Sequence, residues 1–186
     1  MAPNETTHYG HIHGVPVGTE FESFDELRLR GVHRTSQSGI HINTRTGTDS
    51  VVLSGEYADD DDRGSQITYV GHGRGRNQTW KSVGNRSLQL SANSRNLVRV
   101  IRGWQCKSRF APASGYRYDG LYRASNPRIA TGKNGFDVCL IDLTASGLSL
   151  PSIYSHLHRE FQGSLHCQGN THLPRSSPNG RQTSST

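Results

Sequence analysis

The sequence predicts an α+β domain, in which a curled β-barrel is flanked by one or two helices and followed by a disordered C-terminal tail. Three observations favour this fold class. Short runs rich in β-branched and aromatic residues alternate with glycine and charged residues through the middle of the chain, as in small barrels. Residues 23–31 carry helix start and stop signals. After Leu143 the chain becomes rich in Ser, Gly, Pro, Asn and His, which supply little core.

The first expected helix follows a capping box. Ser23 is the expected N-cap, and Glu26 lies at the position that reaches back to it. Phe24 and Leu27 then fall on one helical face, and Gly31 is the expected C′ residue in the left-handed conformation. A second helix is expected at residues 80–91, where Trp80 is interpreted as a core residue.

The strands are expected to be short and separated by glycine-containing turns. Six are expected, at residues 39–43, 50–57, 66–71, 97–103, 118–123 and 135–143. Residues 1–7 are expected to be a flexible lead-in, 8–143 the folded domain, and 144–186 a low-complexity, mostly disordered tail. The histidines of this tail lack the paired spacing of a metal site and do not indicate a working nuclease.

Composition argues against several classes of protein. Of the 186 residues, 31% are hydrophobic, and no apolar run approaches the ~20 residues that a membrane helix needs. The first residues lack the basic and apolar regions of a secretory signal, so neither a membrane protein nor a secreted one is expected. The three cysteines, Cys106, Cys139 and Cys167, form no CxxC pair, and we expect free thiols, with no metal and no cofactor. Cys139 is expected to be a buried residue of a strand.

The charge of the chain favours nucleic acid as a partner. The net charge is +6, and of the 21 basic residues only Lys81, Lys107 and Lys133 are lysine. Arginine offers a planar fork of donors that matches phosphates and base edges. A GC-rich genome would produce the same arginine bias, so composition alone leaves both explanations open.

Residues 50–73 are the densest in chemistry. A buried strand leads to Tyr57 and then to four consecutive aspartates, Asp59 to Asp62, before a strand that carries Tyr69. Adjacent carboxylates repel one another, so most of the four are interpreted as a solvated turn. Arg63 and the absence of a later Glu argue against an EF-hand loop, and no nucleophile or sugar site accompanies the acids to indicate a hydrolase.

Eight stretches of the chain, in order, resemble an SRA domain (SET- and RING-associated, also called YDG). The resemblance covers about residues 8–143 and implies a PUA-like SRA fold. The matching stretches are GVPVGTEF (14–21), GVHR (31–34), SGI (38–40), residues 50–64, TYVGHG (68–73), VRVIRG (98–103), YRYDGLY (116–122) and GKNGF (132–136).

The resemblance implies a protein that reads modified cytosine by extruding the base from duplex DNA into a pocket. The family stacks the base between two tyrosines, which match Tyr57 and Tyr69. Its acidic contact falls on Asp60, a carboxylate that accepts from the cytosine N4 amino group and so selects cytosine over thymine. Backbone groups are expected to meet the rest of the base at Ser54, Gly55, Val70 and Gly71. The two glycines would permit a close approach.

Contacts with the DNA backbone or groove are expected outside the pocket. The segment after Gly73 is shorter than in the family, so a full intercalating finger is not expected. Arg34 is interpreted either as a phosphate contact or as a structural buttress. The other expected contacts are Gln37, His72, Arg74 and Arg76. Tyr116, Tyr118 and Tyr122 are interpreted as barrel packing.

The sequence therefore predicts a DNA-binding domain that performs no chemistry and binds duplex DNA with 5-methylcytosine or a related base. Two alternatives remain. One is the recognition module of a modification-dependent restriction system whose nuclease lies elsewhere, and the other is a non-specific nucleic-acid-binding barrel. A nuclease or chromatin protein is a possible further partner of such a DNA-binding domain or recognition module. The expected compartment is the nucleus in a eukaryote and the cytoplasm or nucleoid in a bacterium.

Overall fold

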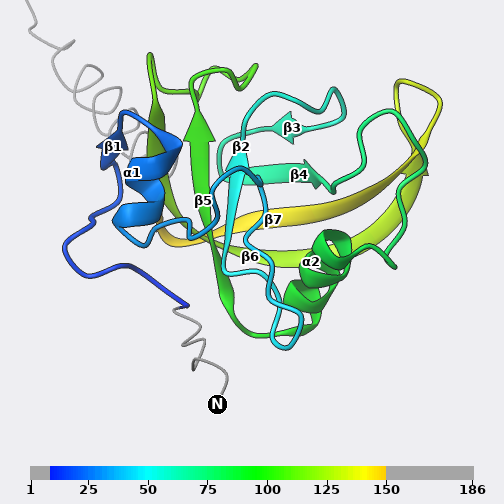
Figure 1. The fold of residues 1–186 in the computed structure, drawn as a ribbon, viewed down its shortest axis with the longest axis horizontal. Coiled ribbons are helices and arrows are strands. Elements are labelled where there is room, and N and C mark those ends of the chain that lie inside the picture. Colours follow the sequence, from blue (N-terminus) through cyan, green and yellow to red (C-terminus); the bar gives the residue numbers. More distant parts are fainter. Residues whose placement is uncertain (1–8, 150–186) are drawn as a thin grey trace, which may run out of the picture. The chain divides into compact units, whose positions relative to one another are not determined.

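A curled half-barrel sheet forms the centre of the fold (Figure 1). The computed structural model describes residues 9–149, so the expected lead-in and most of the expected tail lie outside the described residues. Within that range seven strands form one sheet in the order β2-β5-β6-β7-β4-β3, with β1 paired to β6. The strands are β1 (Glu20–Phe21), β2 (Ser50–Leu53), β3 (Asp61–Asp62), β4 (Gln66–Val70), β5 (Leu97–Gly103), β6 (Tyr116–Thr131) and β7 (Asp137–Ser149).

The curled sheet confirms the predicted fold class, but several strand limits differ from the expectation. The expected strand at 39–43 is reduced to one bridge, between Ile40 and Val51. The Asn43 side chain instead accepts the backbone N–H groups of Arg45 and Thr46 and closes a turn. The β7 strand continues to Ser149, six residues past the expected end, because β6 also runs long and pairs with it antiparallel.

Two helices lie within the described residues, α1 (Phe24–Leu29) and α2 (Val83–Asn93). The capping prediction for α1 is confirmed, since Ser23 Oγ accepts the Glu26 N–H at 3.2 Å and Gly31 has φ +70°. The Glu26 carboxylate caps the N–H of Glu22 rather than that of Ser23. α2 begins three residues later than expected. Neither helix is long and apolar enough to cross a bilayer.

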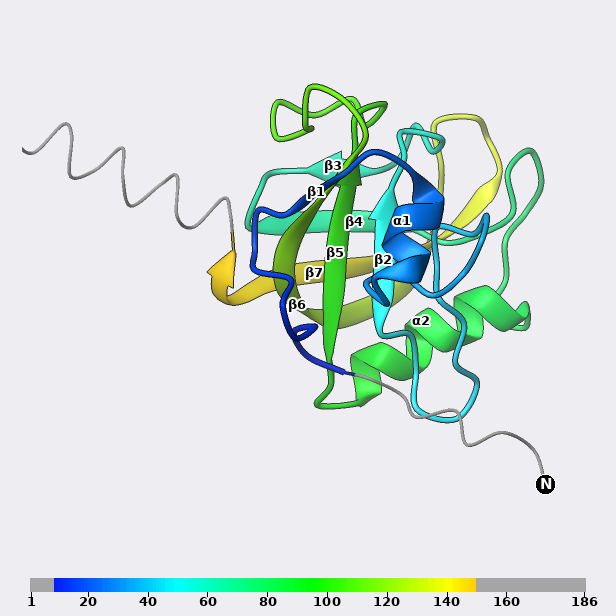
Figure 2. The ribbon, with the colours of Figure 1, turned by 60° about the vertical axis from the view of Figure 1, so that its left-hand side comes forward.

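The two helices cover opposite faces of the sheet (Figure 2). Side chains alternate between faces along a strand. Val51 and Leu53 of β2 therefore pack in the cluster that contains Leu88 of α2, whereas Val52 packs with Leu27 of α1.

Most of the side chains predicted to be core residues are buried, while Trp80 and Tyr116 are partly buried. Trp80 packs against the α2 side of the core, and Cys139 is 1% exposed in β7. Tyr118 and Tyr122 are fully buried, which confirms their packing role. Their hydroxyl groups bond to His11 Nδ1 and to the Gly64 carbonyl, respectively.

Candidate nucleic-acid interface

A cavity of about 620 Å³ lies where four parts of the chain meet. They are the segment between β2 and β4, the loop after β4, the loop after β5, and the tip of the β6–β7 hairpin. The volume is in the range of small-ligand sites, which run ~300–1,000 Å³. Its walls contain Gly55, Glu56, Tyr57, Ala58, Asp59, Asp60, Asp62, Gly73, Arg74, Gly75, Arg76, Gln78, Cys106, Lys107, Gly132, Lys133, Asn134, Phe136 and Val138.

Tyr57 presents an aromatic ring to this cavity. The side chain is half-buried, and its hydroxyl oxygen accepts the backbone N–H of Gly73 at 3.4 Å. Burial raises the pKa of this hydroxyl, with a further contribution from the negative charges of Glu56 and Asp60. The ring is therefore neutral and is held by the loop after β4, as a stacking surface requires.

Asp60 is a carboxyl group of the cavity, and among the described residues no close cation compensates for its burial. One of its oxygens, Oδ1, accepts the Val70 N–H at 2.9 Å. Burial raises the pKa of Asp60 to about 7, and the charges of Asp62 and Asp59 act in the same direction, whereas the hydrogen bond from the Val70 N–H and the charge of Lys133 oppose the rise. A strongly perturbed acid in a cavity is typical of functional sites.

The other expected pocket residues lie beside the cavity rather than in its wall. Tyr69 is 3% exposed, and its hydroxyl donates to the Gly39 carbonyl at 2.9 Å. Burial raises the pKa of Tyr69 well above its usual value, and the charge of Asp60 adds to this shift. Of the seven expected pocket residues, Gly55, Tyr57 and Asp60 line the cavity. The remaining four, which adjoin it in sequence, are Ser54, Tyr69, Val70 and Gly71.

The reason for the two pocket glycines differs from the one expected. A Cβ at Gly55 would lie 2.2 Å from the Gln105 carbonyl oxygen, and a Cβ at Gly71 would lie 2.4 Å from Asn85 Oδ1. Gly55 also has φ +78°, which L side chains rarely adopt. Both glycines thus admit neighbouring groups of the protein itself, and a close approach by a base is not needed to explain them.

The four consecutive aspartates have four different environments. Asp61 is exposed and pairs with Arg63, as expected of a solvated turn. The solvated-turn interpretation is wrong for Asp62, whereas Asp59 lies in a turn and is partly exposed. Asp59 Oδ1 accepts the backbone N–H of Lys133 at 2.8 Å, and Asp62 is 4% exposed in an ion pair with Arg102.

Arg102 links the aspartate segment to the sheet. It is fully buried, and it donates to both carboxylate oxygens of Asp62 at 2.8 and 2.7 Å. A further nitrogen of its guanidinium donates to Asp119 Oδ2 at 2.5 Å, and Asp119 also pairs with Arg117. Buried charges remain ionised when they are paired and hydrogen-bonded in this way. The segment carrying Asp60 is therefore anchored in the core two residues later.

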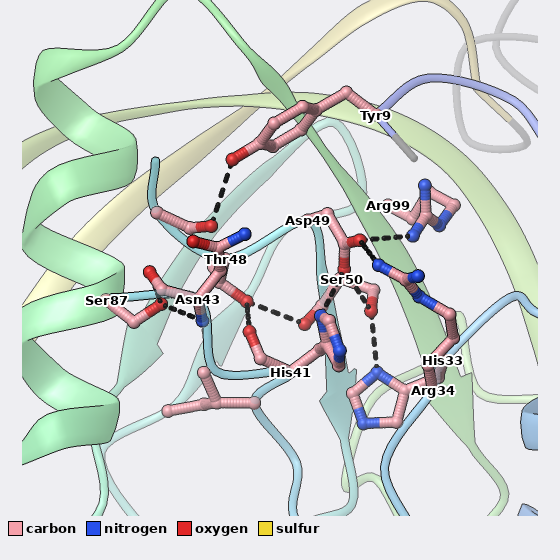
Figure 3. Close-up of polar contacts among 12 residues, drawn as sticks. Tyr9, His33, Arg34, His41, Asn43, Thr48, Asp49, Ser50, Ser87 and Arg99 are labelled. Atoms are coloured by element: carbon pink, nitrogen blue, oxygen red, sulfur yellow. Dashed lines mark hydrogen bonds and ion pairs between the residues drawn. The ribbon is translucent and has the colours of Figure 1, made fainter. Parts of the chain in front are cut away.

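Arg34 contacts Asp49 in the structure (Figure 3). Its NH2 group lies 3.0 Å from Asp49 Oδ2, and Asp49 also pairs with Arg99 and His41. Asp49 and Arg99 are fully buried, so the network is part of the fold. Of the two interpretations of Arg34, the structural buttress has a contact in support. Its side chain is still 29% exposed.

The other expected groove residues lie on two neighbouring loops. Gln37 is exposed, and so are Arg74 and Arg76, which also line the cavity. His72 is half-buried, and its Nε2 lies 3.3 Å from the hydroxyl of Ser38. This contact ties the Gln37 segment to the loop after β4, so the two loops form one surface.

Comparison with known proteins decides the family. The model of the SAD/SRA domain matches residues 8–146. This chain belongs to the SAD/SRA family. The SUVH5 SRA domain, solved in complex with fully methylated CG DNA, is 34% identical with a TM-score of 0.65, over 76% of this chain and 96% of that one. The modification-dependent TagI restriction endonuclease is 36% identical with a TM-score of 0.72, over 75% of this chain and 52% of that one.

Curated relatives of this SRA domain are longer proteins. The UHRF1-like protein of Cryptococcus neoformans var. grubii is 39% identical over 150 residues, which are 70% of this chain and 44% of the relative. The human E3 ubiquitin-protein ligase UHRF2 is 37% identical over 147 residues, which are 63% of this chain and 18% of the relative. The chain thus spans less than half the length of these relatives.

Sequence reasoning missed part of the wall of the SRA cavity. Two of the three lysines of the chain, Lys107 and Lys133, line it together with Cys106 and Phe136. The GKNGF stretch that contains Lys133 and Phe136 is among the motifs of the family resemblance, and this was a usable signal. No local pattern connects Lys107 with the cavity. With Arg74 and Arg76, these lysines give the opening four cationic side chains.

Proposed function

We propose that this SRA domain binds duplex DNA containing 5-methylcytosine or a related base, and that it holds the modified base, turned out of the helix, in the cavity beside Tyr57. The observation that carries the proposal is the composition of the cavity. The cavity is lined by the aromatic ring of Tyr57, by the partly buried acid Asp60 and by four cationic side chains. An extruded base needs a flat stacking surface and partners for its Watson–Crick edge.

Asp60 would accept from the cytosine N4 amino group. Thymine presents a carbonyl oxygen at that position, so a carboxylate at Asp60 would disfavour it. Tyr69 would provide the second stacking surface, since it lies in β4 directly before Val70, whose N–H bonds to Asp60. Backbone groups of Ser54, Gly55 and Gly71 would meet the rest of the base edge.

The rim of the cavity would bind the phosphates on either side of the extruded nucleotide. Arg74, Arg76, Lys107 and Lys133 surround the opening and give a salt-dependent affinity that does not depend on sequence. Gln37 and the exposed part of Arg34 would reach the groove or the backbone from the neighbouring loop. SRA domains solved with methylated DNA, including hemimethylated CG DNA, support this assignment.

The test is a competition titration with duplexes that carry cytosine, 5-methylcytosine or 5-hydroxymethylcytosine at one position, at fixed salt. A buried methyl group contributes about 0.8 kcal/mol, so the methylated duplex should bind about fourfold more tightly than the unmodified one. A 2-aminopurine opposite the modified cytosine should brighten when the base leaves the stack. Equal affinities with unchanged fluorescence would favour a non-specific nucleic-acid-binding barrel.

A second candidate is the recognition module of a modification-dependent restriction system. The likeness to the TagI restriction endonuclease favours this candidate. The match covers about half of that chain, as expected of one module of a larger protein. We propose that the domain itself performs no chemistry and that cleavage would require a nuclease elsewhere. Incubation of the chain with methylated plasmid and Mg²⁺ tests this, since any cleavage would contradict it.

The compartment that we propose for a DNA-binding domain of this kind is the nucleus in a eukaryote and the cytoplasm or nucleoid in a bacterium.

A further inference from the structure

The tip of the β6–β7 hairpin, residues 132–136, forms one wall of the cavity, and Asp59 fastens it to the opposite segment. Asp59 Oδ1 accepts the backbone N–H of Lys133 at 2.8 Å, across 74 positions of sequence. In return, the Lys133 ammonium group donates to the Ala58 carbonyl. Asp59 and Lys133 both line the cavity, so these two hydrogen bonds set the separation of two of its walls.

The fit around Asp59 is close on the hairpin side. A Cβ at Gly132 would lie 2.7 Å from Asp59 Oδ2 and 3.1 Å from Val138 Cγ1. Gly132 is not among the glycines with positive φ, so its backbone conformation is open to other residues. The Asp59 carboxylate lies where the methyl group of an alanine at position 132 would be. Gly132 therefore leaves room for the contact between Asp59 and the hairpin.

The far side of the hairpin is fastened in a similar way by the loop after β4. Asn77 Oδ1 accepts the N–H of Asp137 at 2.9 Å, and Gln78 Oε1 accepts the N–H of Cys139 at 3.0 Å. The hairpin is thus held between two segments that both line the cavity. Asp59 provides the hold on the side of Tyr57 and Asp60, where the proposed base would lie.

We propose that Asp59 is a positioning residue, which holds the β6–β7 hairpin as a wall of the base pocket and thereby determines how closely the pocket fits a 5-methylcytosine. The inference rests on the proposed function. The methyl group of the base contributes binding energy only where protein atoms are in contact with it. If the hairpin moves outward, this contact is lost. Three of the four proposed phosphate contacts, Arg74, Arg76 and Lys107, lie outside the hairpin and do not depend on this fit. Loss of the hold should therefore remove selectivity and leave the binding of unmodified DNA in place.

The test compares Asp59→Ala with Asp61→Ala, the matched control, because Asp61 belongs to the same run of aspartates and its carboxylate pairs with the exposed Arg63. The wild type should prefer the methylated duplex about fourfold, and Asp59→Ala should lower this ratio to near one. Asp61→Ala should keep the ratio of the wild type. Asp59→Asn should restore it, since an amide oxygen can still accept the Lys133 N–H.

Gly132→Ala approaches the same contact from the other side. It should lower the methyl preference in the wild-type background and have a smaller further effect in an Asp59→Ala background, because the nearest group to the new Cβ is then absent and only the 3.1 Å approach to Val138 Cγ1 remains. Amide hydrogen exchange of residues 132–136 should accelerate in Asp59→Ala and not in Asp61→Ala. An unchanged melting temperature separates these effects from loss of the fold.

The outcomes distinguish the inference from the function on which it rests. A wild type with equal affinity for both duplexes would refute the proposed function, and the inference with it. A selective wild type whose selectivity survives in both Asp59→Ala and Gly132→Ala would refute the inference alone. The same holds if Asp59→Asn fails to restore the ratio that Asp59→Ala has lost.

Discussion

The carboxyl group of Asp60 allows stability and binding to be separated in one variant. Burial raises its pKa from 3.8 to about 7, and the neighbouring acids Asp62 and Asp59 contribute in the same direction. This rise in pKa means that keeping Asp60 ionised in the folded state costs about 4 kcal/mol. Asp60→Asn removes this charge and keeps an oxygen that can accept the Val70 N–H.

The sign of the pH dependence follows from the raised pKa. The unfolded chain releases the Asp60 proton near pH 4, whereas the folded protein keeps it until about pH 7. The folded state therefore binds more protons between these values, and its stability falls as the pH rises through this window and is level above it. Between pH 5 and pH 7 the loss is about 1.4 kcal/mol for each pH unit, or about 3 kcal/mol in all.

Urea unfolding of wild type and Asp60→Asn at pH 5 and pH 8 measures this difference. The asparagine variant should be the more stable protein at pH 8, and its advantage should be smaller at pH 5 by about 3 kcal/mol. In a methylated-duplex titration at pH 8 it should bind about tenfold more weakly, because an amide N–H would face the cytosine amino group. The reasoning would be refuted if Asp60→Asn were less stable than wild type at pH 8. It would also be refuted if the difference in free energy of unfolding between the two proteins were the same at both pH values.

Three further predictions concern other groups of the site. Tyr57→Ala should weaken binding to the methylated duplex about tenfold and to the unmodified duplex by less, so that the methyl preference falls towards one in a titration, because a base–aromatic stack contributes about 1–3 kcal/mol. The double variant Arg74→Gln/Arg76→Gln should reduce the slope of log K against log salt by about 2, and an unchanged slope would show that neither contacts phosphate. Arg102→Ala should lower the free energy of unfolding by about 3–5 kcal/mol, measured in urea, since it leaves Asp119 buried without this partner. A loss below about 1 kcal/mol would mean that the charge is compensated otherwise.

Local signals in the sequence predicted local structure well. The capping residue Ser23 and the terminal Gly31 of α1 act within a few positions of one another, and the structure has both as expected. In the structure the apolar residues of β2 and β5 divide between the two faces of the sheet, with Val51, Leu53, Val98 and Val100 in the cluster of α2 and Val52 and Ile101 in the cluster of α1. Such patterns depend on neighbours in the chain and can be read without knowledge of the fold.

The roles of the aspartates could not be read in this way. Asp59 meets Lys133 across 74 positions and Asp62 meets Arg102 across 40, so the sequence shows four like charges without the partners of these two. Electrostatic repulsion then favours a solvated turn, which is correct for Asp61 and wrong for the buried Asp62. The resemblance to a family located the cavity, but it could not indicate which groups hold the walls in place.

The family's alternative name comes from a tripeptide that corresponds here to Tyr118, Asp119 and Gly120, none of which lines the cavity. Asp119 is fully buried and is linked to the cavity through Arg102, which also pairs with Asp62. A natural substitution in the tripeptide would thus resemble a defect in binding although every side chain that lines the cavity is intact. Diagnosing such an allele requires a folding measurement beside the binding one.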